Sequence, residues 1–204
     1  MYFHCARAAA RSNLFGESQT DYLQRKITQQ NIISLSPYGL LKTHNAQGKT
    51  EISPRGDESG FIKTINANTL FLPERPGNKV AVSLRNIINN PNIELLLILP
   101  NTGYTLNICG HAHITTDPAL LSLSIINGKQ AKVGIVIEVT AKQFQLDERL
   151  ATSGLWDSKH YLDKKTLTPF SKALSSHMNG TGLMGKATTL VVDAIVKHDM
   201  KNLY

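Results

Sequence analysis

Glu51-Ile-Ser-Pro-Arg-Gly-Asp57 is the stretch from which the fold is best predicted, together with Leu72-Pro-Glu-Arg-Pro-Gly-Asn-Lys79 after it. The first stretch predicts the end of a strand followed by a turn, and Thr69–Leu72 predicts the next strand. The Arg-Pro-Gly-Asn turn then leads into a helix predicted from Val80 to Asn89. Cationic and small hydrogen-bonding residues thus gather near strand ends and a helix start, where open backbone groups can hold a phosphate.

Length and composition predict a globular, water-soluble protein. The chain has 204 residues, of which 41% are hydrophobic, so it can form one domain with a substantial core. No apolar run approaches the roughly 18 residues of a membrane span. Arg7 and Arg11 interrupt the short alanine run at the N-terminus, which argues against a signal peptide. We therefore expect a cytoplasmic protein that does not contact a membrane.

The charge pattern argues against a nucleic-acid partner. Lysine and arginine total 22 against 15 acidic residues, giving a net charge of +7. The cations are scattered and aromatic residues make up only 6% of the chain, whereas nucleic-acid binding favours basic clusters with exposed aromatics. A solvated basic surface and a functional one both remain open. Cys5 and Cys109 form no CxxC pair, so we expect free thiols in a reducing compartment.

Short strands with hairpin turns dominate the middle of the chain. Ile93–Leu99 is a continuous apolar run and is predicted to be buried on both faces of a sheet. Asp117 and Pro118 predict the start of a helix. The predicted strands are Tyr38–His44, 49–56, Thr69–Leu72, Ile93–Leu99, Tyr104–Ile114 and Ala131–Val139. This pattern favours a mainly β fold with flanking helices (α+β), built around a small antiparallel barrel.

Three segments are predicted along the chain. Residues 1–30 form an N-terminal helical segment, and residues 31–141 form the barrel core. Residues 142–204 become helical and polar, with one helix opening at Thr168-Pro169 and another from Ala187 to Met200. We expect this C-terminal segment to pack on the barrel or on a dimer partner.

A series of spaced motifs resembles one family. In order, these are Ser53-Pro-Arg-Gly-Asp57, Gly60-Phe61, Leu72-Pro-Glu-Arg-Pro-Gly-Asn78, Ser83-Leu-Arg-Asn86, Asn90-Pro91 and Leu106–Ile114 around Gly110. The series resembles the pyridoxamine 5'-phosphate oxidase-like flavoproteins, in particular the branch bearing the Ser-Pro-Arg-Gly-Asp motif. The resemblance spans about residues 20–175. It implies an FMN-binding split β-barrel and a homodimer with FMN at the subunit interface.

The residues suit an FMN phosphate, which carries nearly two negative charges. Arg55, Arg75 and Lys79 can supply positive charge. The neutral donors would be Ser53, Asn78 and Ser83, and backbone would approach the ligand closely at Gly56 and Gly77. The alternative is that Arg55 and Arg75 are surface residues paired with Asp57 and Glu74.

Trp156 extends the resemblance. It lies in Ser153-Gly-Leu-Trp-Asp157, which matches a C-terminal motif of the branch and implies a position near the flavin. The alternative is a lone tryptophan that fixes the tail to the core. Phe3–Ser12 resembles the part of that motif that usually precedes it, so one hypothesis is that the chain follows the tail of a preceding module.

The predicted function is that of an FMN-dependent oxidoreductase whose substrate and electron donor are open, NAD(P)H being one candidate donor. No catalytic acid or base is predicted, because the cofactor would carry the chemistry. His111 and His113 share a strand face, but no third ligand is evident and no metal site is expected. The alternatives are a non-enzymatic protein that binds or stores FMN or haem, or an interaction protein without a cofactor.

Overall fold

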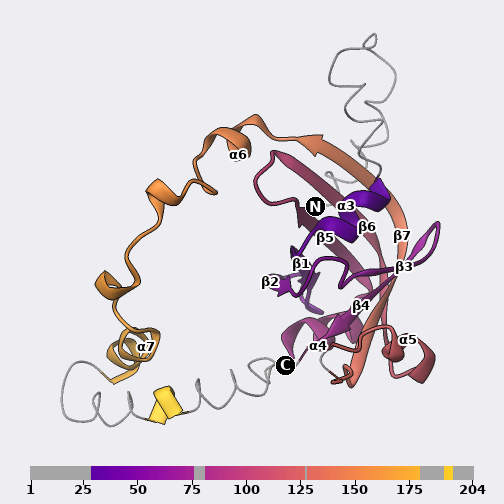
Figure 1. The fold of residues 1–204 in the computed structure, drawn as a ribbon. Helices are drawn as coiled ribbons and strands as arrows, with labels where there is room; N and C mark the ends of the chain where they lie inside the picture. Colours follow the sequence, from indigo (N-terminus) through magenta and orange to yellow (C-terminus); the bar gives the residue numbers. More distant parts are fainter. Residues whose placement is uncertain (1–28, 76–80, 127, 180–190, 195–204) are drawn as a thin grey trace. The chain divides into compact units, whose positions relative to one another are not determined.

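The computed structural model describes residues 29–75, 81–126, 128–179 and 191–194 (Figure 1). These residues belong to two compact units, one ending at Leu155 and the other beginning at Trp156. The first unit contains the β-sheet and is the subject of the next paragraphs. The predicted N-terminal motif around Phe3–Ser12 lies outside the described residues.

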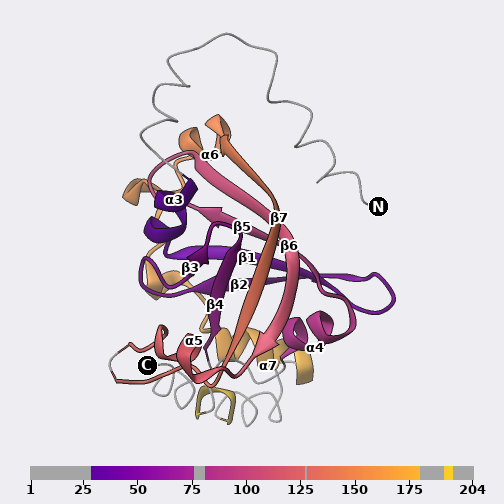
Figure 2. The same cartoon turned by 90° about the vertical axis from the view of Figure 1, so that its right-hand side faces the viewer.

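The first unit contains a seven-stranded sheet in which all neighbouring strands are antiparallel. The strand order is β2-β1-β5-β6-β7-β4-β3. The strands are β1 Tyr38–His44, β2 Thr50–Gly56, β3 Lys63–Asn66, β4 Thr69–Glu74, β5 Asn92–Ile98, β6 Tyr104–Thr115 and β7 Val133–Leu146. The prediction of a mainly β fold with flanking helices is confirmed, and Figure 2 shows β6 and β7 as long neighbouring strands.

The sheet is rolled rather than flat. Arg55 of β2 and Glu74 of β4 contact each other, although their strands lie near opposite ends of the strand order. The strand pairings of the described residues do not join β2 to β4, so side chains bridge the gap between them. We call this junction of the β2 and β4 ends the seam. A rolled sheet with an unpaired seam is the arrangement expected of a split barrel.

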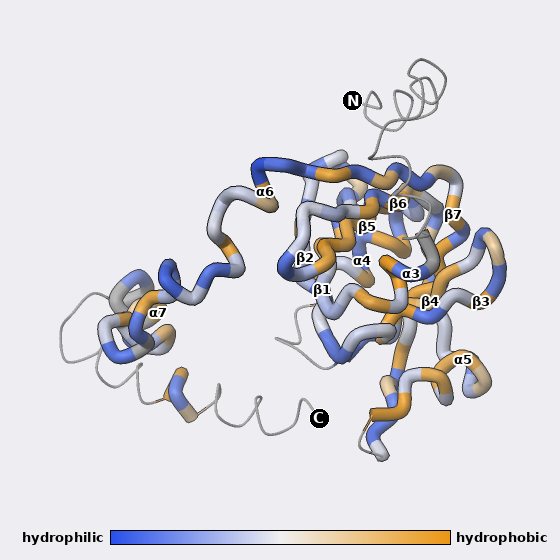
Figure 3. The backbone as a smooth tube through the Cα atoms, turned by 45° about the horizontal axis from the view of Figure 1, so that its top comes forward, coloured by the Kyte–Doolittle hydropathy of each residue, from blue (hydrophilic) through white to orange (hydrophobic). Residues whose placement is uncertain are grey.

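The core fills the inner face of the rolled sheet. Residues such as Leu41, Leu95 and Leu106 are fully buried there, and much of β4 and β5 is coloured as hydrophobic in Figure 3. Helix α3 Gln29–Leu35 packs against β3, β5 and β6 and adds Ile32 and Ile33 to this core. Helix α4 Val82–Asn89 packs against β1, β2 and β6.

Two further helices of the first unit have clear N-caps. Helix α5 Pro118–Ser122 begins at Pro118, and the Asp117 carboxylate accepts a hydrogen bond from the Ala119 amide, as predicted. Helix α6 Glu148–Thr152 is capped in the same way by Asp147. These caps fix how the chain leaves β6 and β7.

Several boundaries differ from the prediction. Strand β7 continues to Leu146, past the predicted end of the core at residue 141, and α3 crosses the predicted boundary at residue 30. The prediction that Ile93–Leu99, most of which lies in β5, is buried on both faces is wrong. Its inner residues are buried, but Glu94, Leu96 and Ile98 on the outer face are only half-buried.

The second unit is described by itself. It contains two short 3₁₀ turns, Ser158–His160 and Lys164–Thr166, and helix α7 Phe170–Asn179. The helix begins directly after Thr168-Pro169, as predicted. Residues 191–194 are helical within the helix predicted from Ala187 to Met200, and the rest of that prediction lies outside the described residues.

Two other predictions concern the environment of the protein. No described helix is long and apolar enough to cross a membrane. The expectation of free thiols is wrong for Cys109, whose sulfur is disulfide-bonded. Cys5 lies outside the described residues. The cytoplasmic location stays a prediction.

Candidate functional site

The first half of the candidate site is the Arg55 guanidinium at the seam. Arg55 and Ser53 lie opposite Gly39 and Leu41 of β1, which places their side chains on the inner face of the sheet. Arg55 donates from Nε to Glu74 Oε2 (3.1 Å) and from Nη2 to Glu74 Oε1 (3.2 Å). Its Nη1 donates to Ser53 Oγ (2.6 Å) and to the Pro54 carbonyl (2.9 Å). The guanidinium fork thus holds both oxygens of one carboxylate.

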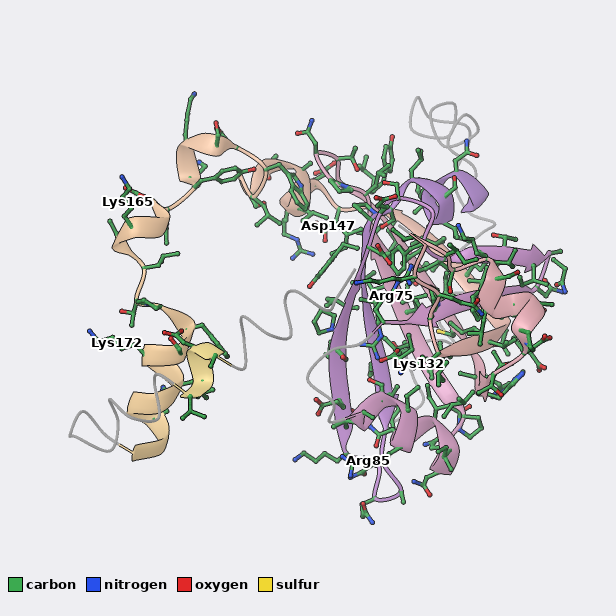
Figure 4. All side chains as sticks on the ribbon, turned by 60° about the horizontal axis from the view of Figure 1, so that its bottom comes forward. Arg75, Arg85, Lys132, Asp147, Lys165 and Lys172 are labelled. Atoms are coloured by element: carbon green, nitrogen blue, oxygen red, sulfur yellow. The ribbon has the colours of Figure 1, made fainter. Side chains whose placement is uncertain are left out.

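The second half is Arg75, the residue after Glu74. Arg75 Nε donates to Asp57 Oδ2 at 2.8 Å, and Asp57 Oδ1 accepts from the Glu58 amide at 2.9 Å. Arg75 Nη2 donates to the Ser124 carbonyl (2.6 Å) and Nη1 to the Lys129 carbonyl (3.4 Å). In Figure 4 Arg75 lies among the side chains of the sheet strands. Arg75 therefore ties the segment after β2 to the segment between α5 and β7.

The two ion pairs differ in burial. The Asp57 side chain is only 1% exposed and that of Arg75 is 14% exposed. In the other pair the Glu74 side chain is 20% exposed and that of Arg55 is 13% exposed. The sequence left open that Arg55 and Arg75 pair with Asp57 and Glu74 on the surface. The two arginines do pair with these two carboxylates, but neither arginine is a surface residue. Arg75 is built into the fold, whereas Arg55 faces a carboxylate that water still reaches.

Burial controls the protonation of Glu74. Loss of hydration raises the pKa of the Glu74 carboxyl from its ordinary value of 4.5, and the charge and hydrogen bonds of Arg55 oppose this only in part. The folded protein therefore binds this proton more tightly than the unfolded chain. The stability contributed by Glu74 is present below its ordinary pKa and is lost as the pH rises through the raised pKa.

The start of helix α4 lies in the same motif region. Its N-cap residue is Ala81, in the left-handed region at φ 52°, and it has no side chain that could accept from the first amides of the helix. Ser83 is buried in the first turn. Asn86 donates from Nδ2 to Thr43 Oγ1 at 3.0 Å, which ties the helix to β1. The first turn of α4 thus leaves backbone N–H groups without a side-chain cap from Ala81.

The structure places the predicted cofactor residues in different parts of the fold. Ser53 and Arg55 lie together at the seam, Gly56 ends β2 beside them, and Arg75 follows Glu74. Ser83 is buried in α4, apart from these hydrogen bonds. Gly77, Asn78 and Lys79 lie outside the described residues.

Trp156 belongs to the second unit. Its indole Nε1 is buried and has no hydrogen-bond partner among the residues that the structure describes. A buried N–H without a partner is costly. The predicted position of Trp156 near a flavin stays a prediction.

The histidine pair has no sign of a metal role. His111 and His113 are both exposed on β6, and His111 lies opposite Glu138 of β7. Within the described ranges no group of three or more histidine, cysteine or acidic side chains could hold a metal ion. We therefore propose no metal site.

Sequence reasoning missed the carbonyl groups that hold Arg75. Ser124 and Lys129 contribute backbone oxygens, which any residue type could supply, so no residue pattern marks them. The role of Glu74 was visible only as one of two possible partners, because the spacing in the sequence does not say which arginine meets which carboxylate.

Comparisons with known proteins give similarities of fold only. No family model and no curated protein matches the chain. Among solved structures, HupZ of Group A Streptococcus is 19% identical, with a TM-score of 0.49, and the match covers 59% of this chain and 95% of HupZ. A pyridoxinephosphate oxidase family protein of Clostridium acetobutylicum is 12% identical (TM-score 0.44; 63% and 91% covered). The haem storage protein HutZ of Vibrio cholerae is 13% identical (TM-score 0.42; 61% and 94% covered).

Proposed function

We propose that this chain binds FMN noncovalently by its phosphate and acts as a flavin-dependent oxidoreductase. The observation that carries the proposal is the Arg55 fork on the inner face of the seam, with the Ser53 hydroxyl beside it. The fork already holds two anionic oxygens from Glu74, so its shape and charge suit a phosphate in the same place.

The start of helix α4 is a second candidate for phosphate contacts, because its first amides receive no side-chain cap from Ala81. The predicted ligands Gly77, Asn78 and Lys79 precede Val80 and Ala81 in the sequence, and their contacts stay a prediction. Backbone N–H groups at a helix start favour an anion. Arg75 has its donors committed to Asp57 and two carbonyls, so we propose that it fixes the seam and contributes charge.

FMN, when bound, would supply hydride or electron transfer between a small-molecule substrate and a donor such as NAD(P)H. The residues of this chain would bind and orient it. Arg55 and Ser53 would hold the phosphate, and a position of Trp156 near the flavin stays a prediction.

Replacing Arg55 by alanine is expected to weaken FMN binding by about 10- to 100-fold, because a charge-assisted bidentate contact is lost. Quenching of flavin fluorescence measures the dissociation constant. Riboflavin, which lacks the phosphate, should bind wild type and Arg55→Ala alike. Equal binding of FMN to both proteins would contradict the proposed phosphate site.

Turnover distinguishes the enzyme from a storage protein. The FMN-loaded protein should oxidise NAD(P)H, or another donor found by screening, at a rate above that of free FMN. Retained flavin with no donor that reacts would favour the non-enzymatic binding protein considered from the sequence.

We also propose a homodimer with FMN at the subunit interface. The supporting observation is the outer face of β2, β1 and β5. Leu40 and Leu96 lie opposite each other there and are half-buried, and exposed Ile52 lies on the same face opposite Lys42. The apolar run of β5 has the composition of a strand covered on both faces, yet among the described residues of the first unit only the inner face is fully covered. A second copy would cover the other.

Replacing Ile52 by aspartate should convert the dimer to a monomer in light scattering without unfolding it, because Ile52 is 58% exposed in the single chain. The matched control is Ile88→Asp on α4, where the side chain is 72% exposed and the dimer should persist. A monomeric wild-type protein, or a dimer that tolerates Ile52→Asp, would contradict this interface.

A further inference from the structure

Glu74 occupies the place that the proposed function gives to a phosphate. Its two carboxylate oxygens accept from Nε and Nη2 of Arg55 at 3.1 and 3.2 Å. Glu74 therefore occupies the two donors of Arg55 that could bind an anion side by side. A phosphate and this carboxylate cannot use the same donors together. Ligand binding at Arg55 thus requires Glu74 to leave.

The rest of the Arg55 contacts would survive that exchange. Nη1 of Arg55 is held by Ser53 Oγ and by the Pro54 carbonyl, and neither contact involves Glu74. The guanidinium therefore keeps its position when the carboxylate departs. The fork is preorganised for a second anion.

Glu74 is the carboxylate that can be displaced at this seam. Its side chain is 20% exposed, compared with 1% for Asp57, which also accepts a backbone hydrogen bond from Glu58. Burial disfavours the charged form of Glu74, as its raised pKa indicates, and Arg55 compensates for this only in part. Leaving the fork therefore costs Glu74 less than leaving Arg75 would cost Asp57.

We propose that Glu74 determines the ligand specificity of the Arg55 site, by occupying the guanidinium fork as a competing anion that only a more highly charged phosphate group displaces. This inference rests on the proposed function. A monocarboxylate ligand would replace one singly charged carboxylate by another, with no net gain in binding free energy. A phosphate carrying nearly two charges binds the same fork more strongly. Glu74 thus selects phosphorylated ligands against carboxylates.

The test is the affinity of Glu74→Gln for FMN and for riboflavin, measured by flavin fluorescence quenching. Glutamine keeps the size of the side chain and removes the competing charge. We expect FMN to bind at least about tenfold more tightly to Glu74→Gln than to wild type, because a like charge beside the phosphate is gone. Riboflavin affinity should not change.

The matched control is Glu138→Gln. Glu138 is also a strand glutamate, but its side chain is exposed on β7, outside the face of β2, β1 and β5 that we propose as the dimer interface. The substitution changes the net charge equally and should leave FMN affinity unchanged. An equal gain in Glu138→Gln would mean that only the overall charge matters, which would overturn the proposal.

A competition experiment on wild type needs no variant. Inorganic phosphate should displace FMN, and acetate at matched ionic strength should not. Equal competition by acetate, or FMN binding in Glu74→Gln that is equal to or weaker than in a wild type that does bind FMN, would overturn the role of Glu74 alone. Absence of FMN binding in both proteins would overturn the proposed function together with this inference.

Discussion

Replacing Asp57 by alanine is expected to lower the free energy of unfolding by about 3–5 kcal/mol, the usual cost of breaking a buried ion pair from one side. The Asp57 carboxylate is almost fully buried and meets the Arg75 guanidinium at 2.8 Å. Its removal leaves a positive charge in a site that is largely closed to water. It also leaves the Glu58 amide without its acceptor. Denaturant unfolding followed by circular dichroism measures the change.

The control is an ion pair in which water surrounds both charges. Arg149 and Asp147 lie 3.7 Å apart at the start of α6, with the Arg149 side chain fully solvated, and Figure 4 places Asp147 beyond the end of β7. Arg149→Ala should change stability by no more than about 0.5 kcal/mol. A similar loss in both variants would mean that burial of the Asp57–Arg75 pair does not set its importance.

Gly110→Ala should destabilise the protein by about 3 kcal/mol, at the upper end of overpacking effects. Gly110 lies at the irregularity in the β6–β7 pairing, between Cys109 and Gly110. A Cβ there would overlap the Glu138 carbonyl oxygen and would come within 3.0 Å of Ile137 Cγ2. Because a backbone atom cannot turn aside as a side chain can, the two central strands would have to separate.

Gly56→Ala is the matched control for that substitution. A Cβ at Gly56 would meet Tyr38 Cδ2 at 3.2 Å, the Pro37 carbonyl at 3.4 Å and Tyr38 Cε2 at 3.9 Å. We expect a change below about 1 kcal/mol, since the tighter neighbour is the Tyr38 ring, a side chain that can shift by the few tenths of an ångström required. Thermal melts of the two variants compare them directly, and a Gly110→Ala protein as stable as Gly56→Ala would contradict the close approach of β6 and β7.

Strong local patterns made most of the strands predictable. The alternation in Tyr38–His44 and Tyr104–Ile114 matches β1 in full and β6 to within one residue. The turn between β3 and β4 is also set locally, because the Asn68 amide donates to Asn66 Oδ1 there. Where side chains alternate between core and solvent, the sequence carries the strand signal itself.

The elements that were missed have no such signal. Strand β3 is a four-residue strand at the edge of the described sheet, where it pairs with β4. The end of β7 was placed too early because Thr140–Gln145 is mostly polar, and its strand form comes from pairing with the long β6. Long-range pairing decided both cases, and composition could not show it.

For the candidate site, the sequence indicates the residue types but not which arginine pairs with which carboxylate. The motif around Arg55 and Arg75 marked cations near the strand ends, and rolling of the sheet brings those ends together. The pairing of each cation with its carboxylate depends on the fold. That pairing separates a structural arginine, Arg75, from one whose partner can be displaced, Arg55.

The most direct test of the central claim is an absorbance spectrum of the purified protein after saturation with FMN and desalting. The account predicts that the flavin bands stay with wild type and are lost in Arg55→Ala, while both proteins keep the same circular dichroism spectrum. A folded wild-type protein that emerges colourless would contradict FMN binding at the seam.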